Sequence, residues 1–348
     1  MTEPADGNPL PHELWLQRGQ ALEAEQRIKE AVAAYDHAIS LVRAAGNAAE
    51  PSARLALALA WMNRGNALQK RGTPSTLADS IRAYDEAIVL FRTLPLEKQP
   101  RLRNHLGAAW LNRGHALMVV ADSAAVGSFE LAIAELGQIP LDADPFFRLN
   151  FAGAHTNLAH ALLASAPDRA AVSARAALAA IGAAERAHEA FAGLSLRARR
   201  ALVMALGALL HLAERSAQPI SELATEATDV IDDGLAVAAE LERSGRIECR
   251  PLAVRLFHLG VQIYGAHQPH FLDEFVTETL ATPGFGSDAE FRAIAETALS
   301  QTLDRVQRSG IFLADTPDAK RRLETVRSLR ATQEHLSTLR AQISTHST

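Results

Sequence analysis

The sequence predicts an all-helical fold built as an array of repeated helix pairs, on the basis of its composition, its internal repetition and its proline spacing. Of the 348 residues, 48% are hydrophobic but 5% are aromatic. Ala and Leu supply most of the apolar residues, and this mixture favours helix over strand. Because the chain exceeds the length of one ordinary core, it is expected to form two or three domains or one elongated array.

An eight-residue segment recurs along the chain at intervals of about 47 residues, which is the mark of a repeat architecture. The copies read WLQRGQAL at 15–22, WMNRGNAL at 61–68, WLNRGHAL at 110–117 and, in weaker form, HTNLAHAL at 155–162. Gly207 and Gly260 are candidates for the small residue of a fifth and a sixth copy. The repetition therefore favours an array over separate domains.

A second block follows each of the first three copies, so each repeat is expected to contain two helices. The blocks read AYDHAISL at 34–41, AYDEAIVL at 83–90 and SFELAIAEL at 128–136. Pro51, Pro100, Pro145 and Pro251 precede the first helices, while Gly72-Thr73-Pro74 and Ser165-Ala166-Pro167 fit turns before second helices. Short loops then leave helices of about 18 residues.

Four regions follow from this pattern. Residues 1–11 form a flexible tail, 12–193 form four clear helix pairs, 194–268 form two divergent pairs, and 269–348 form atypical capping helices. Within the last region, a helix pair is expected in 269–309, broken at Thr282-Pro283-Gly284. Residues 317–344 read as a closing helix, and the seven-residue spacing of Leu329, Leu336 and Ile343 leaves a homodimer through this helix as the alternative.

The motif W-x-x-R-G-x-A-L, followed by A-x-x-Y-D-x-A-I, resembles the tetratricopeptide repeat (TPR) family. The resemblance is strong over 12–136, fair to about 185 and weak beyond. It implies a right-handed superhelical solenoid of antiparallel helix pairs, in which Trp61, Gly65 and Leu68 would meet Tyr84, Ala87 and Ile88. The same contacts would recur between Trp110, Gly114, Leu117 and Phe129, Ala132, Ile133. The family's usual period is 34 residues, so this would be a long-period variant, and HEAT-type repeats remain the alternative.

Composition also limits the partners. A formal net charge of −5 gives no basic field that would draw the chain onto nucleic acid. The longest apolar stretch, 201–210, is too short to cross a membrane, the N-terminus lacks the features of an export signal, and Cys249 is the single cysteine. We therefore expect a cytoplasmic protein with no nucleic-acid or membrane partner.

Arginine and acidic residues recur together in the first three repeats. Arg18, Arg64 and Arg113 follow each Trp, and Asp36, Asp85 and Glu130 follow each second-helix aromatic residue. In the fourth repeat Leu158 and Leu178 take both positions. This joint loss favours an ion pair between the two helices of one repeat, such as Arg64 with Asp85, over an anion-binding ladder.

Amide side chains recur at one position of the first helices and predict a peptide-binding groove. By resemblance to TPR arrays that bind extended peptides, this position faces an inner groove, where carboxamides pair with a ligand's main chain. Polar residues three positions later lie on the same helix face. Hydrogen bonding between neighbouring repeats is the structural alternative. The predicted groove comprises Gln17, Gln20, Asn63, Asn66, Asn112, His115, Asn157 and His160.

The remaining candidates for chemistry are few. His267, His270 and Glu274 form one compact ligand-like set with His258 upstream, but the proline at 269 separates His267 from the helix that would carry His270 and Glu274. No phosphate-binding loop or catalytic motif occurs, so no cofactor, metal or catalytic residue is expected.

The leading hypothesis is a non-enzymatic scaffold or adaptor that binds a protein or peptide. A ligand-controlled regulator using a pocket or dimer face in the C-terminal third is the second, and a metal-dependent enzyme is the third.

Overall fold

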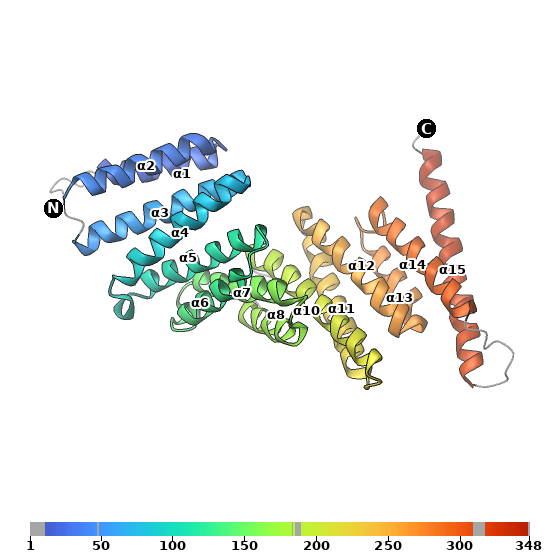
Figure 1. Cartoon of the computed structure of the whole chain (residues 1–348). Coiled ribbons are helices and arrows are strands. Elements are labelled where there is room, and N and C mark those ends of the chain that lie inside the picture. The colour runs from blue at the N-terminus through green and yellow to red at the C-terminus, as the bar shows by residue number, and fades with distance from the viewer. Residues whose placement is uncertain (1–10, 47–48, 183, 185–188, 309–316, 347–348) are drawn as a thin grey trace. The chain divides into compact units, whose positions relative to one another are not determined.

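A computed structural model describes residues 11–46, 49–182, 184, 189–308 and 317–346, and these residues form helices joined by turns, with no strand among them (Figure 1). The chain divides into two compact units, Met1–Leu162 and Leu163–Thr348, called here the N-terminal and the C-terminal unit. The boundary falls between the two helices predicted for the fourth pair. Most of the predicted tail, 1–10, lies outside the described residues.

The N-terminal unit contains three complete helix pairs and one further first helix. Its helices are α1 (Pro11–Ala24), α2 (Ile28–Ala44), α3 (Pro51–Arg71), α4 (Pro74–Arg92), α5 (Pro100–Val119), α6 (Ala124–Leu136) and α7 (Pro145–Leu162). The two helices of each pair pack together, and each second helix also packs against the first helix of the next pair. This is the consecutive packing that the repetition predicts.

The predicted punctuation accounts for the helix ends. Helices α3, α5 and α7 begin at Pro51, Pro100 and Pro145, where proline loses no helical hydrogen bond. The turn between α3 and α4 contains Gly72 with φ 67°, a left-handed conformation that glycine adopts without strain. The Thr73 and Thr76 side chains then cap α4 reciprocally. The turn chemistry thus sets where the long helices stop and start.

Glycine lets the two helices of a pair approach closely, as the motif predicts. A Cβ atom added to Gly65 would lie 2.7 Å from Cε1 of Tyr84, and one added to Gly114 would lie 2.6 Å from Cε1 of Phe129. Gly19 stands in the same relation to Tyr35. These three aromatic rings are completely buried. The predicted contact between glycine and an aromatic residue is therefore confirmed in the second and third pairs, and the first pair makes the same contact.

Trp61 and Trp110 lie between successive pairs, and each is close to two guanidinium groups. Arg43 and Arg64 each lie 5.4 Å from the ring centre of Trp61. The equivalent distances from Arg92 and Arg113 to Trp110 are 5.1 Å and 5.6 Å. One arginine of each set comes from the same helix as the tryptophan and the other from the preceding second helix. Cation–π contacts of this kind tie neighbouring pairs together.

The arginine and acid positions do form ion pairs, but between repeats and not within them. Arg64 Nε lies 2.7 Å from Asp36 Oδ1 of the preceding pair, and Arg113 Nε lies 2.7 Å from Asp85 Oδ1. The prediction that Arg64 bridges to Asp85 was therefore wrong. Each first helix also packs against the second helix before it, and the arginine points to that side. Arg113 in addition donates to Ser128 Oγ at 2.7 Å.

A double-mutant cycle distinguishes the two pairings. We expect Arg64→Leu and Asp36→Leu to show a coupling energy of about 0.5 kcal/mol, because the pair is partly exposed to water. Arg64→Leu and Asp85→Leu should instead be additive. Urea unfolding of the four variants measures both quantities. Coupling of Arg64 to Asp85 of the same size would contradict the observed pairing.

The C-terminal unit continues the helical packing with less regular pairs. Its helices are α8 (Pro167–Ile181), α10 (Glu189–Arg215), α11 (Ser221–Arg243), α12 (Arg250–His267), α13 (Leu272–Ala281), α14 (Ala289–Arg308) and α15 (Pro317–His346). Helices α13 and α14 fall within the region predicted as a broken pair. A cluster of aromatic rings, comprising Phe257, Tyr264, Phe275, Phe285 and Phe291, joins α12 to the segments that follow it.

Gly207 and Gly260, the candidate glycines of the fifth and sixth repeats, differ in how closely other atoms approach them. A Cβ atom on Gly260 of α12 would lie 2.4 Å from Cζ of Phe275, so this copy keeps the close approach. Around Gly207 of α10 the nearest atom is Cδ1 of Ile263, at 3.8 Å, which is an ordinary contact distance. Gly207 is therefore not an equivalent of Gly65. The α10–α11 pair has no aromatic residue at that point, which explains why the motif fades there.

Helix α15 packs against α13 and α14 of its own chain. Leu329 is completely buried and Leu336 is 2% exposed. A dimerising coil would have to present these two side chains to a partner, so their burial supports the closing-helix interpretation. The side chain of Ile343, the third residue of the predicted heptad spacing, lies outside the described residues.

Candidate functional site

The first helices of the N-terminal unit form one continuous face, called here the inner face. Helices α1, α3, α5 and α7 contact one another in sequence, in addition to their contacts with the second helices. The second helices do not approach one another to the same degree. In a stack of helix pairs, the side on which successive helices come closest is the concave side. The eight predicted groove residues all lie on these four helices.

The structure places the predicted residues at different depths. Gln17, Gln20 and His115 are exposed, while the four asparagines and His160 are half-buried. Asn63 and Asn157, which hold the same register position in two repeats, make no side-chain hydrogen bond within the described part of the chain. His160 Nδ1 lies 2.9 Å from the Thr156 carbonyl of its own helix. The predicted set therefore contains both bonded and unbonded polar groups.

Asn66 and Asn112 are bonded to each other across neighbouring repeats. The Asn112 Nδ2 group donates to Asn66 Oδ1 at 3.0 Å, and the Tyr84 hydroxyl lies 2.9 Å from the same oxygen. The Tyr84 hydroxyl also lies 2.7 Å from Gln69 Oε1, and the Gln69 amide bonds to His115 Nδ1. The structural alternative, bonding between repeats, thus describes these two asparagines. It does not describe Asn63 or Asn157.

A second amide pair on this face was missed by the sequence analysis. Asn150 Nδ2 of α7 donates to Asn104 Oδ1 of α5 at 3.0 Å, and Asn104 is 8% exposed. The two residues are 46 positions apart, as are Asn66 and Asn112, and Gln69 and His115. The available signal was this shared separation, which lies close to the repeat length.

The inner-face network depends on a coupling between the two helices of each pair. Tyr84 bonds to Gln69, and in the preceding pair the Tyr35 hydroxyl donates to Glu23 Oε2 at 2.6 Å. Burial raises the pKa of both tyrosines, so both hydroxyls stay protonated donors. In the third pair Phe129 replaces tyrosine, and Met118 replaces the polar acceptor. The hydroxyl and its acceptor are therefore present together or absent together.

The inner face carries little charge. Glu23 Oε1 and Lys70 Nζ, 2.9 Å apart, form an ion pair between α1 and α3. Desolvation lowers the pKa of His115, and burial lowers the pKa of His155 to about 4, so both rings are neutral at physiological pH. None of the eight predicted residues is a carboxylate or a fixed cation. Such a surface suits uncharged polar groups, of which the peptide main chain is the commonest.

The histidines considered as possible metal ligands each contact a different neighbour. His267 Nδ1 lies 3.4 Å from Glu214 Oε1 of α10, and His267 is largely buried. The ring of His270 packs against Phe271 at 4.1 Å between centres. Within the described residues, no group of three or more His, Cys, Asp or Glu side chains could hold a metal ion. The side chain of Cys249 is buried.

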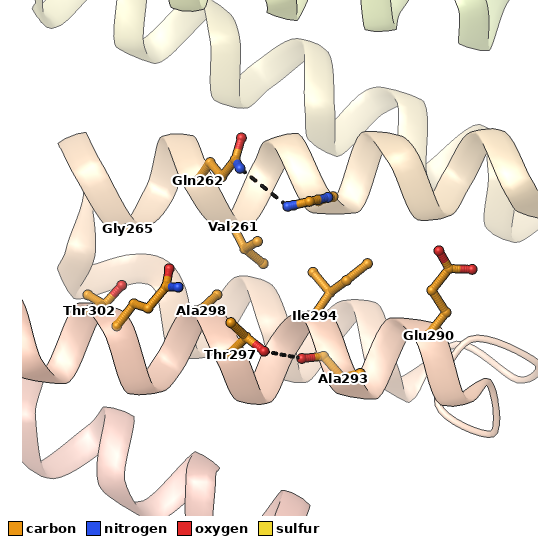
Figure 2. Close-up of a pocket in the computed structure, with 11 residues that line it drawn as sticks. Val261, Gln262, Gly265, Glu290, Ala293, Ile294, Thr297, Ala298 and Thr302 are labelled. Atoms are coloured by element: carbon orange, nitrogen blue, oxygen red, sulfur yellow. Dashed lines mark hydrogen bonds between the residues drawn. The ribbon is translucent and has the colours of Figure 1, made fainter.

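A cavity of about 530 Å³ lies between α12 and α14 of the C-terminal unit (Figure 2). Val261, Gly265, Ile294 and Ala298 supply its apolar lining. Its polar lining comprises His258, Gln262, Glu290, Thr297, Gln301 and Thr302. The volume falls in the range of small-ligand sites, and His258 was the one member of the predicted histidine set found here.

The contacts between glycine and aromatic residues and the packing of the helix pairs are those that the tetratricopeptide resemblance predicts, so the described residues form an all-helical, tetratricopeptide-like array of repeats. No protein-family model matches the chain, and no curated protein matches it. Among the helices of the described residues, none is long and apolar enough to cross a membrane.

Two solved structures illustrate how distant the similarities are. One is a circular tandem repeat protein with a novel repeat topology and enhanced subunit contact surfaces, at 13% identity and a TM-score of 0.40, covering 96% of this chain and 84% of that one. The other is the TPR domain of P58(IPK), at 12% identity and a TM-score of 0.17, covering 96% and 99%. Neither similarity is high enough to carry an argument about function.

Proposed function

We propose that this chain is a non-enzymatic scaffold that holds an extended segment of a partner protein on the inner face of its N-terminal unit. The observation that carries the proposal is the pair Asn63 and Asn157. Both are half-buried carboxamides on α3 and α7, and neither has a side-chain hydrogen bond in the described part of the chain. Their carboxamides are therefore open to a ligand's main chain, and asparagine at an interior helix position forms a helix less well than alanine would.

The bonded asparagines also keep one polar group each for a ligand. Asn66 accepts through Oδ1, which leaves its amide hydrogens, and Asn112 donates through Nδ2, which leaves its carbonyl oxygen. A peptide main chain offers one acceptor and one donor per residue, so it can use both. Because the Tyr84 hydroxyl holds Asn66 and Asn66 holds Asn112, little conformational entropy is lost when a peptide binds.

The test compares the two classes of asparagine. We expect Asn63→Ala with Asn157→Ala to leave stability unchanged or slightly improved, since alanine is the better helix former. Affinity for linear peptides selected on the wild-type protein from a display library should fall by roughly ten-fold to a hundred-fold. Fluorescence polarisation measures the affinity, and circular dichroism melting measures the stability.

Asn66→Ala with Asn112→Ala is the matched comparison. This variant breaks bonds within the protein, so it should melt below wild type. If the Asn63 and Asn157 variant keeps full affinity for every selected peptide, the inner-face proposal fails. Equal loss of stability in both variants would assign the asparagines to holding the repeats together.

The cavity between α12 and α14 favours a second function, a regulator controlled by a ligand bound in the C-terminal unit. Its apolar lining and convergent polar groups are the usual composition of ligand sites. The two functions are compatible, because they use different units of the chain.

A further inference from the structure

Helix α1 leaves uncovered the side that α3 buries against a preceding second helix. Ala60 and Ala67 of α3 are completely buried in apolar clusters that they form with α2. The recurring segment places Leu14 and Ala21 at these two positions of α1, and both are exposed, Leu14 by 50%. Within the described residues, α1 packs against α2 of its own pair and contacts α3. The side of α1 that carries Leu14 and Ala21 is called here the end face.

Arg18 also lies on the end face, because steps of four and three residues return to the same side of a helix. At the equivalent positions Arg64 pairs with Asp36 and Arg113 pairs with Asp85, each at 2.7 Å and each on the preceding second helix. Arg18 is exposed and forms no ion pair with a described carboxylate. The first repeat therefore has the arginine of this interface without the acid.

The neighbours of Arg18 leave its charge available. Its guanidinium lies 5.0 Å from the ring centre of Trp15, and the His37 ring contacts the same indole at 4.2 Å between centres. Glu30 is the nearby acid. Its pKa is lowered mainly because the Arg27 side chain donates hydrogen bonds to it, and the charge of Arg18 contributes least. A carboxylate from outside the chain can therefore pair with Arg18.

The second helices that cover this side of α3 and α5 share one sequence, D-x-A-I-x-L-x-R. It reads DHAISLVR at 36–43 and DEAIVLFR at 85–92. The Asp pairs with the arginine of the following first helix, and the alanine and isoleucine belong to the apolar clusters that the following helix completes. The final arginine lies against the next tryptophan, 5.4 Å from Trp61 and 5.1 Å from Trp110. The fold thus contains two examples of the helix that fits this surface.

We propose that the end face binds an amphipathic helix of a partner protein, whose acidic residue pairs with Arg18 and whose apolar residues cover Leu14 and Ala21. The partner helix would lie as α2 lies on α3. Its final arginine matters less here, because His37 already packs on the Trp15 ring. A second copy of this chain fits poorly, since two end faces would bring cations together without a carboxylate. The proposal uses none of the eight predicted groove residues, so it goes beyond the inner-face function.

The experiment uses the α4 sequence, residues 73–93, as a fluorescein-labelled peptide kept helical by a hydrocarbon staple between its exposed positions 82 and 86. We expect the full-length protein to bind it, and Arg18→Glu to weaken binding at least about ten-fold because like charges then meet. Asp85→Arg in the peptide should weaken wild-type binding similarly. The same peptide should regain affinity for the Arg18→Glu protein. Fluorescence polarisation measures all four combinations.

Two further variants complete the design. Leu14→Asp should also weaken binding, because it places a carboxylate where the apolar side of the peptide docks. Arg330→Glu, at an exposed position of α15, makes the same charge change outside the N-terminal unit and should bind like wild type. Arg18→Glu should melt like wild type, since Arg18 has no ion pair to lose. A large fall in its melting temperature would assign Arg18 a structural role and overturn the proposal.

The remaining outcomes are equally decisive. The proposal is overturned if the wild-type protein fails to bind the peptide, if Arg18→Glu keeps full affinity, or if exchanging the two charges restores nothing. Sedimentation equilibrium tests the second copy: a dimer that Leu14→Asp dissociates would give the end face to self-association. Binding that appears only after residues 1–9 are removed would give it to that segment of the chain.

Discussion

Leu329→Ala is expected to lower the stability of the C-terminal end of the array by about 2–5 kcal/mol, because it removes a completely buried side chain that α13 and α14 cannot fully replace. In an array where each element contacts its neighbours, the loss should be local. Hydrogen exchange should therefore accelerate in α13, α14 and α15 before it changes in the N-terminal unit. Urea unfolding followed by exchange mass spectrometry measures both effects.

Arg330→Ala is the matched control, since Arg330 is exposed beside Leu329 on the same helix. It should change stability by no more than about 0.5 kcal/mol. The closing-helix interpretation also requires that Leu329→Ala leave the oligomeric state unchanged at all protein concentrations. Dissociation of a wild-type dimer by this substitution would instead support the dimerising coil.

Gly65→Ala is expected to destabilise the second helix pair by about 1–3 kcal/mol through overpacking. The new Cβ would lie 2.7 Å from the Tyr84 ring, which is completely buried and whose hydroxyl is held by Asn66 and Gln69. The ring cannot rotate away without breaking these bonds. Circular dichroism melting of the full chain measures the loss.

Gly207→Ala provides a control at a helical glycine that has no close neighbour. Its nearest neighbour would be 3.8 Å away, so the gain in helix propensity should dominate and raise stability by about 0.5–1 kcal/mol. The two substitutions should therefore act in opposite directions. A melting temperature that rises for both would show that the Tyr84 ring adjusts, and the close approach would lose its structural importance.

The sequence predicted local features well because short-range rules determine them. Proline and glycine positions fix the ends of α3 and α4, and the motif fixes the contact between Gly65 and Tyr84. The direction of the ion pairs could not be predicted in this way. Arg64 has an acid at a similar position before it and after it, so periodicity alone gives no preference between Asp36 and Asp85. The rotation of α3 against α2 decides the matter.

The sequence predicted only part of the candidate site, again because periodicity does not determine how neighbouring helices pack. Recurrence identified the helix face that carries Asn63, Asn112 and Asn157, but it could not separate bonded from unbonded amides. That difference depends on how closely α3, α5 and α7 approach one another at each level. Gln69 and Asn104 were missed because each occurs once in its register position, although both bond to a partner in the next repeat.

The pairing of the Tyr84 hydroxyl with Gln69 restricts how repeats of this protein can be exchanged in design libraries. Moving α6 into the second pair would bring Phe129 opposite Gln69, and moving α4 into the third pair would bring the Tyr84 hydroxyl opposite Met118. Either chimera takes one hydrogen-bond partner from a partly buried polar group, which costs about 1–3 kcal/mol. Transplanting both helices of a pair as one cassette avoids this mismatch. Shuffling of whole hairpins should thus yield more folded clones than shuffling of single helices.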